Sequence, residues 1–150
     1  MTTTREAVFS ALFAQLKTTA IAGLQVERNQ SLPDQIPAAG LVVQRDGREA
    51  PPPVETLLSP ARYLYDETVE VEAAVQLADD AQTQQREIAI DAVIAAITTA
   101  LTANRALGGL ADDLRIGLPK MSDIAVAGAA AIKSATIPVR VFYATADAGT

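Results

Sequence analysis

Three carboxylates in one short stretch, Asp66, Glu70 and Glu72, are the residues best placed to do chemistry. In an extended strand these even-numbered side chains point to the same face, so the two glutamates are near neighbours. Paired carboxylates can carry out glycoside hydrolysis or bind a hard cation. A solvent-facing row of a strand is normally charged, however, and no neighbouring motif marks a cleft. We therefore interpret the row as an exposed surface and predict no catalytic residue.

Other chemical groups occur without the partners that their chemistry needs. The acidic doublets 79–80 and 112–113 stand at cap or turn positions, where carboxylates are favoured for local reasons. Weak Ca²⁺ binding stays open for either doublet, although neither resembles an EF-hand loop. The glycine pair 108–109 follows a predicted helix, whereas phosphate-binding glycines follow a strand and open a helix. Lys133 and Ser134 are adjacent, and adjacent side chains usually point apart, which disfavours a Ser–Lys pair.

Composition narrows the function classes further. The 150 residues include no histidine and no cysteine, which removes the commonest general base, the commonest metal ligand and any thiolate nucleophile. The net charge of −6 argues against a nucleic-acid-binding surface, which requires clustered lysine and arginine. No apolar run reaches the ~18 residues that span a bilayer, and the N-terminus lacks a signal-peptide pattern. We predict a soluble protein made in the cytoplasm, with no cofactor, no metal, no membrane association and no enzymatic activity.

The element that positions the three carboxylates is a strand predicted over residues 61–77. Its odd positions are mostly apolar, and the tyrosines 63 and 65 extend that side backwards, interrupted by Glu67. This alternation predicts a strand with one buried and one wet face. At ~3.3 Å per residue the strand would span roughly 55 Å, longer than ordinary strands of about 3–10 residues. Such a strand must bend, carry a bulge or project beyond its own domain.

The remaining pattern predicts an α+β fold in a single domain, residues 1–150, with an antiparallel sheet and two amphipathic helices on one face. The predicted helices cover residues 4–22, with a Thr3/Glu6 capping box, and 81–103, capped by Asp79 or Asp80. The predicted strands are 41–45, 61–77, 114–118 and 137–145, with a further short strand around 124–126 left open. Asp46-Gly47 predicts a turn.

Residues 48–60 are predicted to form an exposed loop, because they include three consecutive prolines at 51–53. Proline lacks the backbone donor that a sheet requires, so this stretch is not expected to continue the strand before it. A ligand for a proline-recognition module is one interpretation of the loop. A stiff connector between two strands is the simpler one.

Five stretches, taken in order, resemble a known family. They are the N-terminal amphipathic helix and residues 37–47 (PAAGLVVQRDG), 58–65 (LSPARYLY) with the acidic strand after it, 104–113 (NRALGGLADD) and 137–143 (IPVRVFY). The pattern is similar to the tail terminator, or tail completion, proteins of long-tailed phages and of phage-like gene transfer agents. The resemblance covers most of the chain and rests on pattern and order, with no invariant chemical motif.

The resemblance implies an α+β subunit that assembles into a hexameric ring. In that family the ring caps the head-proximal end of the tail tube, stops tube polymerisation and meets the head connector, and DNA passes through its lumen. The implied partners are other copies of the chain, the tail tube protein and the head–tail connector protein. The implied location is the virion tail, assembled in the cytoplasm of a bacterial host.

Alternatives to this interpretation are another head–tail joining protein, a small group-transfer enzyme and an adaptor that uses the proline loop. The enzyme would need a nucleophile, a base or a cofactor loop, and the sequence shows none. As candidate subunit or channel surface we predict Asp66, Glu70, Glu72, Asp46 and Arg48.

Overall fold

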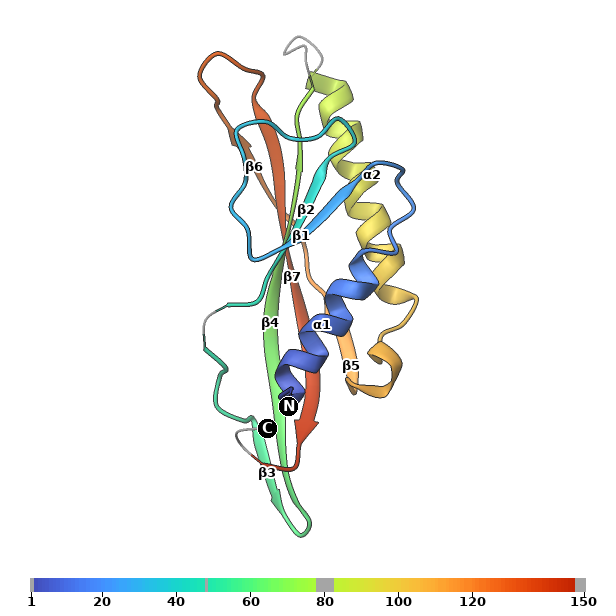
Figure 1. Cartoon of the computed structure of the whole chain (residues 1–150), viewed down its shortest axis with the longest axis vertical. Coiled ribbons are helices and arrows are strands. Elements are labelled where there is room, and N and C mark those ends of the chain that lie inside the picture. Colours follow the sequence, from blue (N-terminus) through green and yellow to red (C-terminus); the bar gives the residue numbers. More distant parts are fainter. Residues whose placement is uncertain (1, 48, 78–82, 148–150) are drawn as a thin grey trace.

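Two long strands, β4 (Ala61–Val75) and β7 (Ile132–Thr145), form the spine of the fold. The computed structural model describes residues 2–47, 49–77 and 83–147. The two strands pair antiparallel from Tyr63↔Thr145 to Val75↔Lys133, and Figure 1 shows them along the longest axis of the molecule. At ~3.3 Å per residue, β4 alone is about 50 Å long. The predicted long strand is confirmed, although it ends at Val75 rather than Leu77.

The other elements complete one sheet and place two helices against it. They are α1 (Thr4–Leu16), β1 (Gln25–Arg28), β2 (Leu41–Arg45), β3 (Glu55–Leu58), α2 (Thr83–Thr102), a 3-10 turn (Leu107–Gly109), β5 (Asp113–Ile116) and β6 (Lys120–Ile124). Within the described residues the sheet has seven strands in the order β1-β2-β4-β7-β5, with β3 on β4 and β6 on β7. The predicted α+β class is confirmed.

One pair of neighbouring strands, β1 and β2, runs parallel, so the prediction of a purely antiparallel sheet is wrong at this edge. The sequence gives little sign of β1, because its four residues include a single apolar side chain, Val26. The chain returns to β2 through Gly40, which has a φ of +108°. A Cβ at Gly40 would lie 3.1 Å from a Leu24 side-chain carbon and 3.3 Å from the Ala74 carbonyl oxygen. This crossing therefore requires glycine for its conformation and for its space.

Both helices pack on one face of the sheet, as predicted, and the main core lies between them and the spine. Its members from the helices and from the odd-numbered positions of the spine include Val8, Phe9, Leu12, Leu16, Ile90, Val93, Ile97, Leu101, Val69, Val71, Ile137, Val139 and Val141. Period-2 alternation along each strand and 3.6-residue periodicity along each helix bring these side chains together.

Helix α1 begins as predicted and ends earlier than predicted. The Thr3 hydroxyl accepts a hydrogen bond of 3.2 Å from the Glu6 amide, the N-cap interaction that the sequence indicated. The helix ends at Leu16 instead of residue 22, since the Thr18 hydroxyl donates to the Gln15 carbonyl at 2.7 Å and draws the chain into a turn. The predicted caps of α2, Asp79 and Asp80, lie outside the described residues.

The other face of the sheet carries no helix among the described residues, and we call it the open face. It comprises the even-numbered side chains of β4 and β7 and the matching positions of β2 and β5. At one end the 29–40 connection covers a small second core of Ile36, Leu41, Val43, Ala74 and Ile132. Toward the other end the open face is polar.

Two strands differ from the predicted loop and strand boundaries near the spine. β3 lies inside the predicted 48–60 loop, where it pairs with the start of β4 from Glu55↔Leu64 to Leu58↔Ala61. The consecutive prolines precede it and belong to no strand, as expected. β7 begins at Ile132 instead of residue 137, because residues 132–136 pair with β6 and, from Lys133 onward, also with β4.

Strands β5 and β6 are also displaced from their predicted positions. β5 ends at Ile116: the Gly117 amide still donates to the Pro138 carbonyl at 2.7 Å, but proline has no amide hydrogen with which to return a bond. A Cβ at Gly117 would lie 2.7 Å from Pro138 Cγ, so the chain crosses β7 here only without a side chain. β6 covers Lys120–Ile124. The short strand that the sequence analysis left open was placed around residues 124–126, where β6 in fact ends.

Candidate functional site

The predicted carboxylate row lies on the open face, where two of its three members form ion pairs. Asp66 accepts from Arg140 Nε at 3.1 Å and from a second nitrogen of the same guanidinium. Glu72 accepts from Arg45 at 2.8 and 3.0 Å. Glu70 is exposed and forms no ion pair with a described residue. The structure therefore brings the row together as an alternation of both charge signs instead of a continuous acidic stripe.

Arginine and aromatic side chains extend this charged surface across β7 to β5. The guanidiniums of Arg115 and Arg140 each lie 5.1 Å from the centroid of the Phe142 ring. Arg115 also donates to Asp113 at 3.2 Å. The hydrogen bond from Asp66 raises the pKa of Arg140 above its ordinary value. Each of these arginines is thus held by a carboxylate or a ring, which fixes the pattern of charge on the open face.

Asp46 and Arg48, the other two predicted surface residues, are placed differently. Asp46 is 6% exposed, and its carboxylate accepts from Arg28 at 2.7 Å, Asn29 at 3.0 Å and Gln44 at 2.7 Å. The negative charge of Asp46 is therefore satisfied by contacts within the subunit and is not presented at its surface. Arg48 lies outside the described residues.

A buried ion pair that the sequence did not indicate joins α1 to the spine. Glu67 is 3% exposed on the helix-covered face, where it accepts from Arg5 at 2.6 Å and from the Tyr143 hydroxyl at 2.8 Å. The Tyr143 ring stacks on Tyr65 with centroids 5.2 Å apart. Burial, with the Glu67 carboxylate adding to it, raises the pKa of Tyr143. The one sign in the sequence was a glutamate at an odd, inward position of β4.

A second bridge links the same helix to β1 and to the end of β2. The Arg28 guanidinium donates to both oxygens of Glu6, at 2.8 and 2.9 Å, and to Asp46. Hydrogen bonds from Arg28 and Ser10 lower the pKa of Glu6. Arg5 also donates to the Asp46 carbonyl at 3.3 Å. The two bridges fix the start of the 46–60 connection relative to the spine.

We expect replacement of Glu6 by glutamine to remove a pH-dependent part of the stability. Because the pKa of Glu6 is lowered on folding, its contribution is present above the ordinary value of 4.5 and is lost as the pH falls through the folded value. Half of the side chain is exposed, so the contribution stays below about 1 kcal/mol. Thermal unfolding should separate wild type from Glu6→Gln at pH 7 and not at pH 3. A separation of equal size at both pH values would contradict this assignment.

The turn between β3 and β4 forms a hairpin, residues 54–64, that projects from one end of the molecule (Figure 1). Its exposed apolar side chains are Val54 at 67%, Leu57 at 44% and Leu58 at 85%. Arg62 lies opposite Leu57 in the register, is also exposed, and forms no ion pair with a described residue. A projecting hairpin with bare leucines is typical of a surface that contacts another protein.

No protein-family model and no curated protein matches the chain. Solved structures do match it. Among them is a chain from the cryo-EM structure of an extracellular contractile injection system, PVC sheath/tube terminator in extended state. The TM-score is 0.33 and the identity 15%, and the alignment covers 93% of this chain and 57% of that one. A likeness of this size assigns no function to this chain, which spans little more than half the length of its neighbour.

Among the described residues, the groups considered for chemistry in the sequence do not come together in a site. Lys133 pairs with Glu87 on α2 at 3.0 Å, whereas Ser134 is the next residue of the same strand and faces the other side of the sheet. In the described parts of the chain, no group of three or more His, Cys, Asp or Glu residues could hold a metal ion. No described helix is both long enough and apolar enough to cross a bilayer.

Proposed function

We propose that this protein is a structural virion protein, a tail terminator of a long-tailed phage or gene transfer agent. It forms a homo-hexameric ring at the head-proximal end of the tail tube, stops tube polymerisation and joins the tail to the head connector. It acts through its surfaces and has no enzymatic activity. Its partners are other copies of itself, the tail tube protein and the head–tail connector protein.

The observation that carries this proposal is the length of the spine relative to the core that it supports. β4 and β7 pair over thirteen positions, yet the hairpin at one end lies beyond both helices and keeps its leucines in solvent. A monomer gains nothing from an exposed hairpin, whereas a subunit of an assembly can bury it against a neighbour. The sequence resemblance to tail terminators supports the same proposal.

The open face suits the wall of a channel through which DNA passes. Asp66 and Glu72 hold the guanidiniums of Arg140 and Arg45, which would otherwise be free to bind phosphates. Glu70 adds an exposed negative charge between them. DNA binding by proteins is driven by lysine and arginine contacts to phosphate, so a surface of this kind lets DNA slide without being held.

Releasing these arginines should convert the open face into a DNA-binding surface. We expect the variant Asp66→Asn/Glu72→Gln to bind duplex DNA at low salt, with log K falling against log salt by a slope of about −1.8 for two phosphate contacts per subunit. Fluorescence anisotropy with labelled duplex measures this. The control Glu70→Gln removes one charge without releasing an arginine and should leave binding undetectable. Equal binding by wild type would refute the channel argument.

Deletion of the gene in the phage or particle tests the proposed function itself. Without a terminator, tube polymerisation does not stop, so electron microscopy should show overlong tails without heads, and a plasmid copy of the gene should restore normal length. Tails of normal length that lack heads would identify a different head–tail joining protein. Normal complete particles would refute the proposal.

A further inference from the structure

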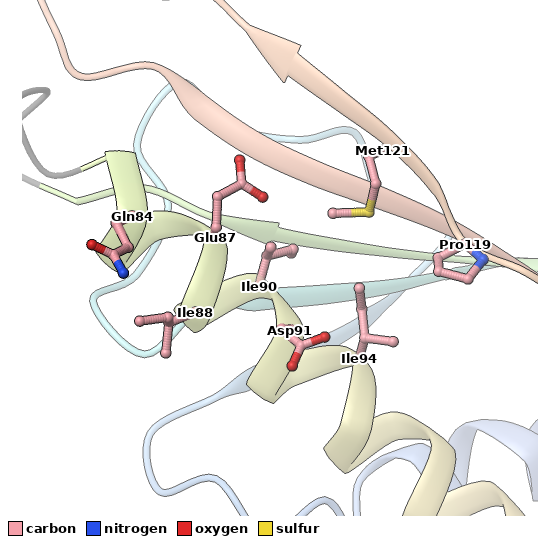
Figure 2. A pocket seen from close by; sticks show the side chains of 8 residues that line it. All are labelled: Gln84, Glu87, Ile88, Ile90, Asp91, Ile94, Pro119 and Met121. Atoms are coloured by element: carbon pink, nitrogen blue, oxygen red, sulfur yellow. The ribbon is translucent and has the colours of Figure 1, made fainter.

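A groove of about 470 Å³ lies between α2 and the start of β6. Figure 2 shows Ile90, Ile94 and Met121 turned toward the gap between the helix and the strand, with Ile88 at the edge of the groove. Ile88 is 61% exposed and Met121 is 45% exposed, so these side chains are uncovered in the single chain. Large apolar groups in such a position mark a contact with another molecule.

The rim of the groove offers one carboxylate to a partner. Glu87 is already paired with Lys133 at 3.0 Å. Asp91 is exposed, lies beside Ile88 and Ile94 in Figure 2, and forms no ion pair with a described residue. A complementary partner would therefore present a few apolar side chains and one positive charge.

The projecting hairpin of the same chain presents that combination. Its tip carries Leu57 and Leu58, and Arg62 lies directly across from Leu57. Arg62 has no ion-pair partner among the described residues. The hairpin cannot reach its own groove, because β3 lies at one end of the long axis and the start of α2 lies near the other (Figure 1).

We infer that the hairpin tip of one copy inserts into the α2–β6 groove of the next copy. Leu57, which shares a face of the hairpin with Arg62, packs against Ile88 and Met121, and Arg62 pairs with Asp91. The contact joins two different surfaces head to tail, so it propagates from copy to copy until rotation closes a ring. This inference rests on the proposed ring assembly and specifies the subunit contact within it.

Cysteine cross-linking tests the contact without background, because the chain has no cysteine of its own. We expect the double variant Leu57→Cys/Ile88→Cys to give a ladder of covalent oligomers after mild oxidation, which collapses on reduction. The matched control is Leu57→Cys/Leu110→Cys, since Leu110 is 44% exposed and lies outside the groove. All substituted sites are exposed, so the variants should fold, and circular dichroism checks this. A yield no higher than that of the control would overturn the contact.

A charge exchange tests the same contact by a second route. Arg62→Glu places like charges together and should weaken self-association, measured by light scattering, by about tenfold. Combining Arg62→Glu with Asp91→Arg should restore it, and a combination as weak as the single variant would overturn the contact. If gene deletion gives overlong tails but the cysteine variant forms no cross-link, the contact is refuted and the terminator function is not. If the cross-link forms but gene deletion leaves normal tails, the terminator function is refuted and the contact is not.

Discussion

Replacing Glu67 by alanine should lower the free energy of unfolding by about 2–4 kcal/mol, which makes it one of the two largest single effects expected in this chain. The carboxylate is 3% exposed and satisfies both the Arg5 guanidinium and the Tyr143 hydroxyl. Removing it leaves a charge and a buried hydroxyl without their acceptor. Arg5 is 26% exposed and keeps some contact with water, which moderates the loss. Urea unfolding measures the change directly.

Two comparison variants separate this loss from a general effect of altering β4. Glu70→Ala, on the open face of the same strand, should change the free energy of unfolding by no more than about 0.5 kcal/mol. Replacing the whole group by Arg5→Met/Glu67→Leu/Tyr143→Phe should cost less than Glu67→Ala alone, because no polar group is left unpaired. If Glu67→Ala and Glu70→Ala cost the same, the buried pair does not hold α1 on the sheet.

The alternation along β4 was sufficient to predict its length, its buried side and the placement of Asp66, Glu70 and Glu72 on the opposite side. It was not sufficient to interpret Glu67, which appeared as an interruption of the apolar side. Its role depends on Arg5, 62 residues earlier in the chain. Periodicity reports which face a residue occupies, and it carries no information about which distant residue will meet it there.

The short strands were missed for a related reason. β1 and β3 have four residues each, with no clear alternation, and they exist because a longer neighbour offers its backbone groups. Strand preference in such segments is set by the neighbouring strand more than by local sequence. The parallel direction of β1 follows from the path of the 29–40 connection, which no local motif specifies.

The charge pattern of the open face likewise could not be predicted from the sequence. Asp66 and Arg140 are 74 residues apart, and Glu72 and Arg45 are 27 apart. The antiparallel register between β4, β7 and β2 brings each pair together. Without that register, three acidic residues predicted an acidic stripe. With it, two of the three carboxylates are paired with Arg140 and Arg45.

Phe9 and Phe13 provide the second large effect and a matched comparison within one helix. They stand four positions apart on α1, so helical periodicity alone places both on the same side of the helix. In the structure Phe9 is 1% exposed beneath Arg5, whose guanidinium carbon lies 4.6 Å from the ring centroid, and its carbonyl accepts from Gln44 at 3.0 Å. Phe13 is only half-buried, with Lys17 lying 4.5 Å from the centroid of its ring.

We expect Phe9→Ala to lower the free energy of unfolding by about 3–5 kcal/mol, because it opens a cavity that the spine and helices cannot close. Phe13→Ala should cost about 1 kcal/mol, since part of that ring is already in water. Urea unfolding of both variants at matched pH measures the difference. Because α1 also carries Arg5, the loss of Phe9 should further weaken the Glu67 pair, so Phe9→Ala and Glu67→Ala should be non-additive. Equal losses for the two phenylalanines, or full additivity with Glu67→Ala, would show that α1 is not held to the spine as one unit.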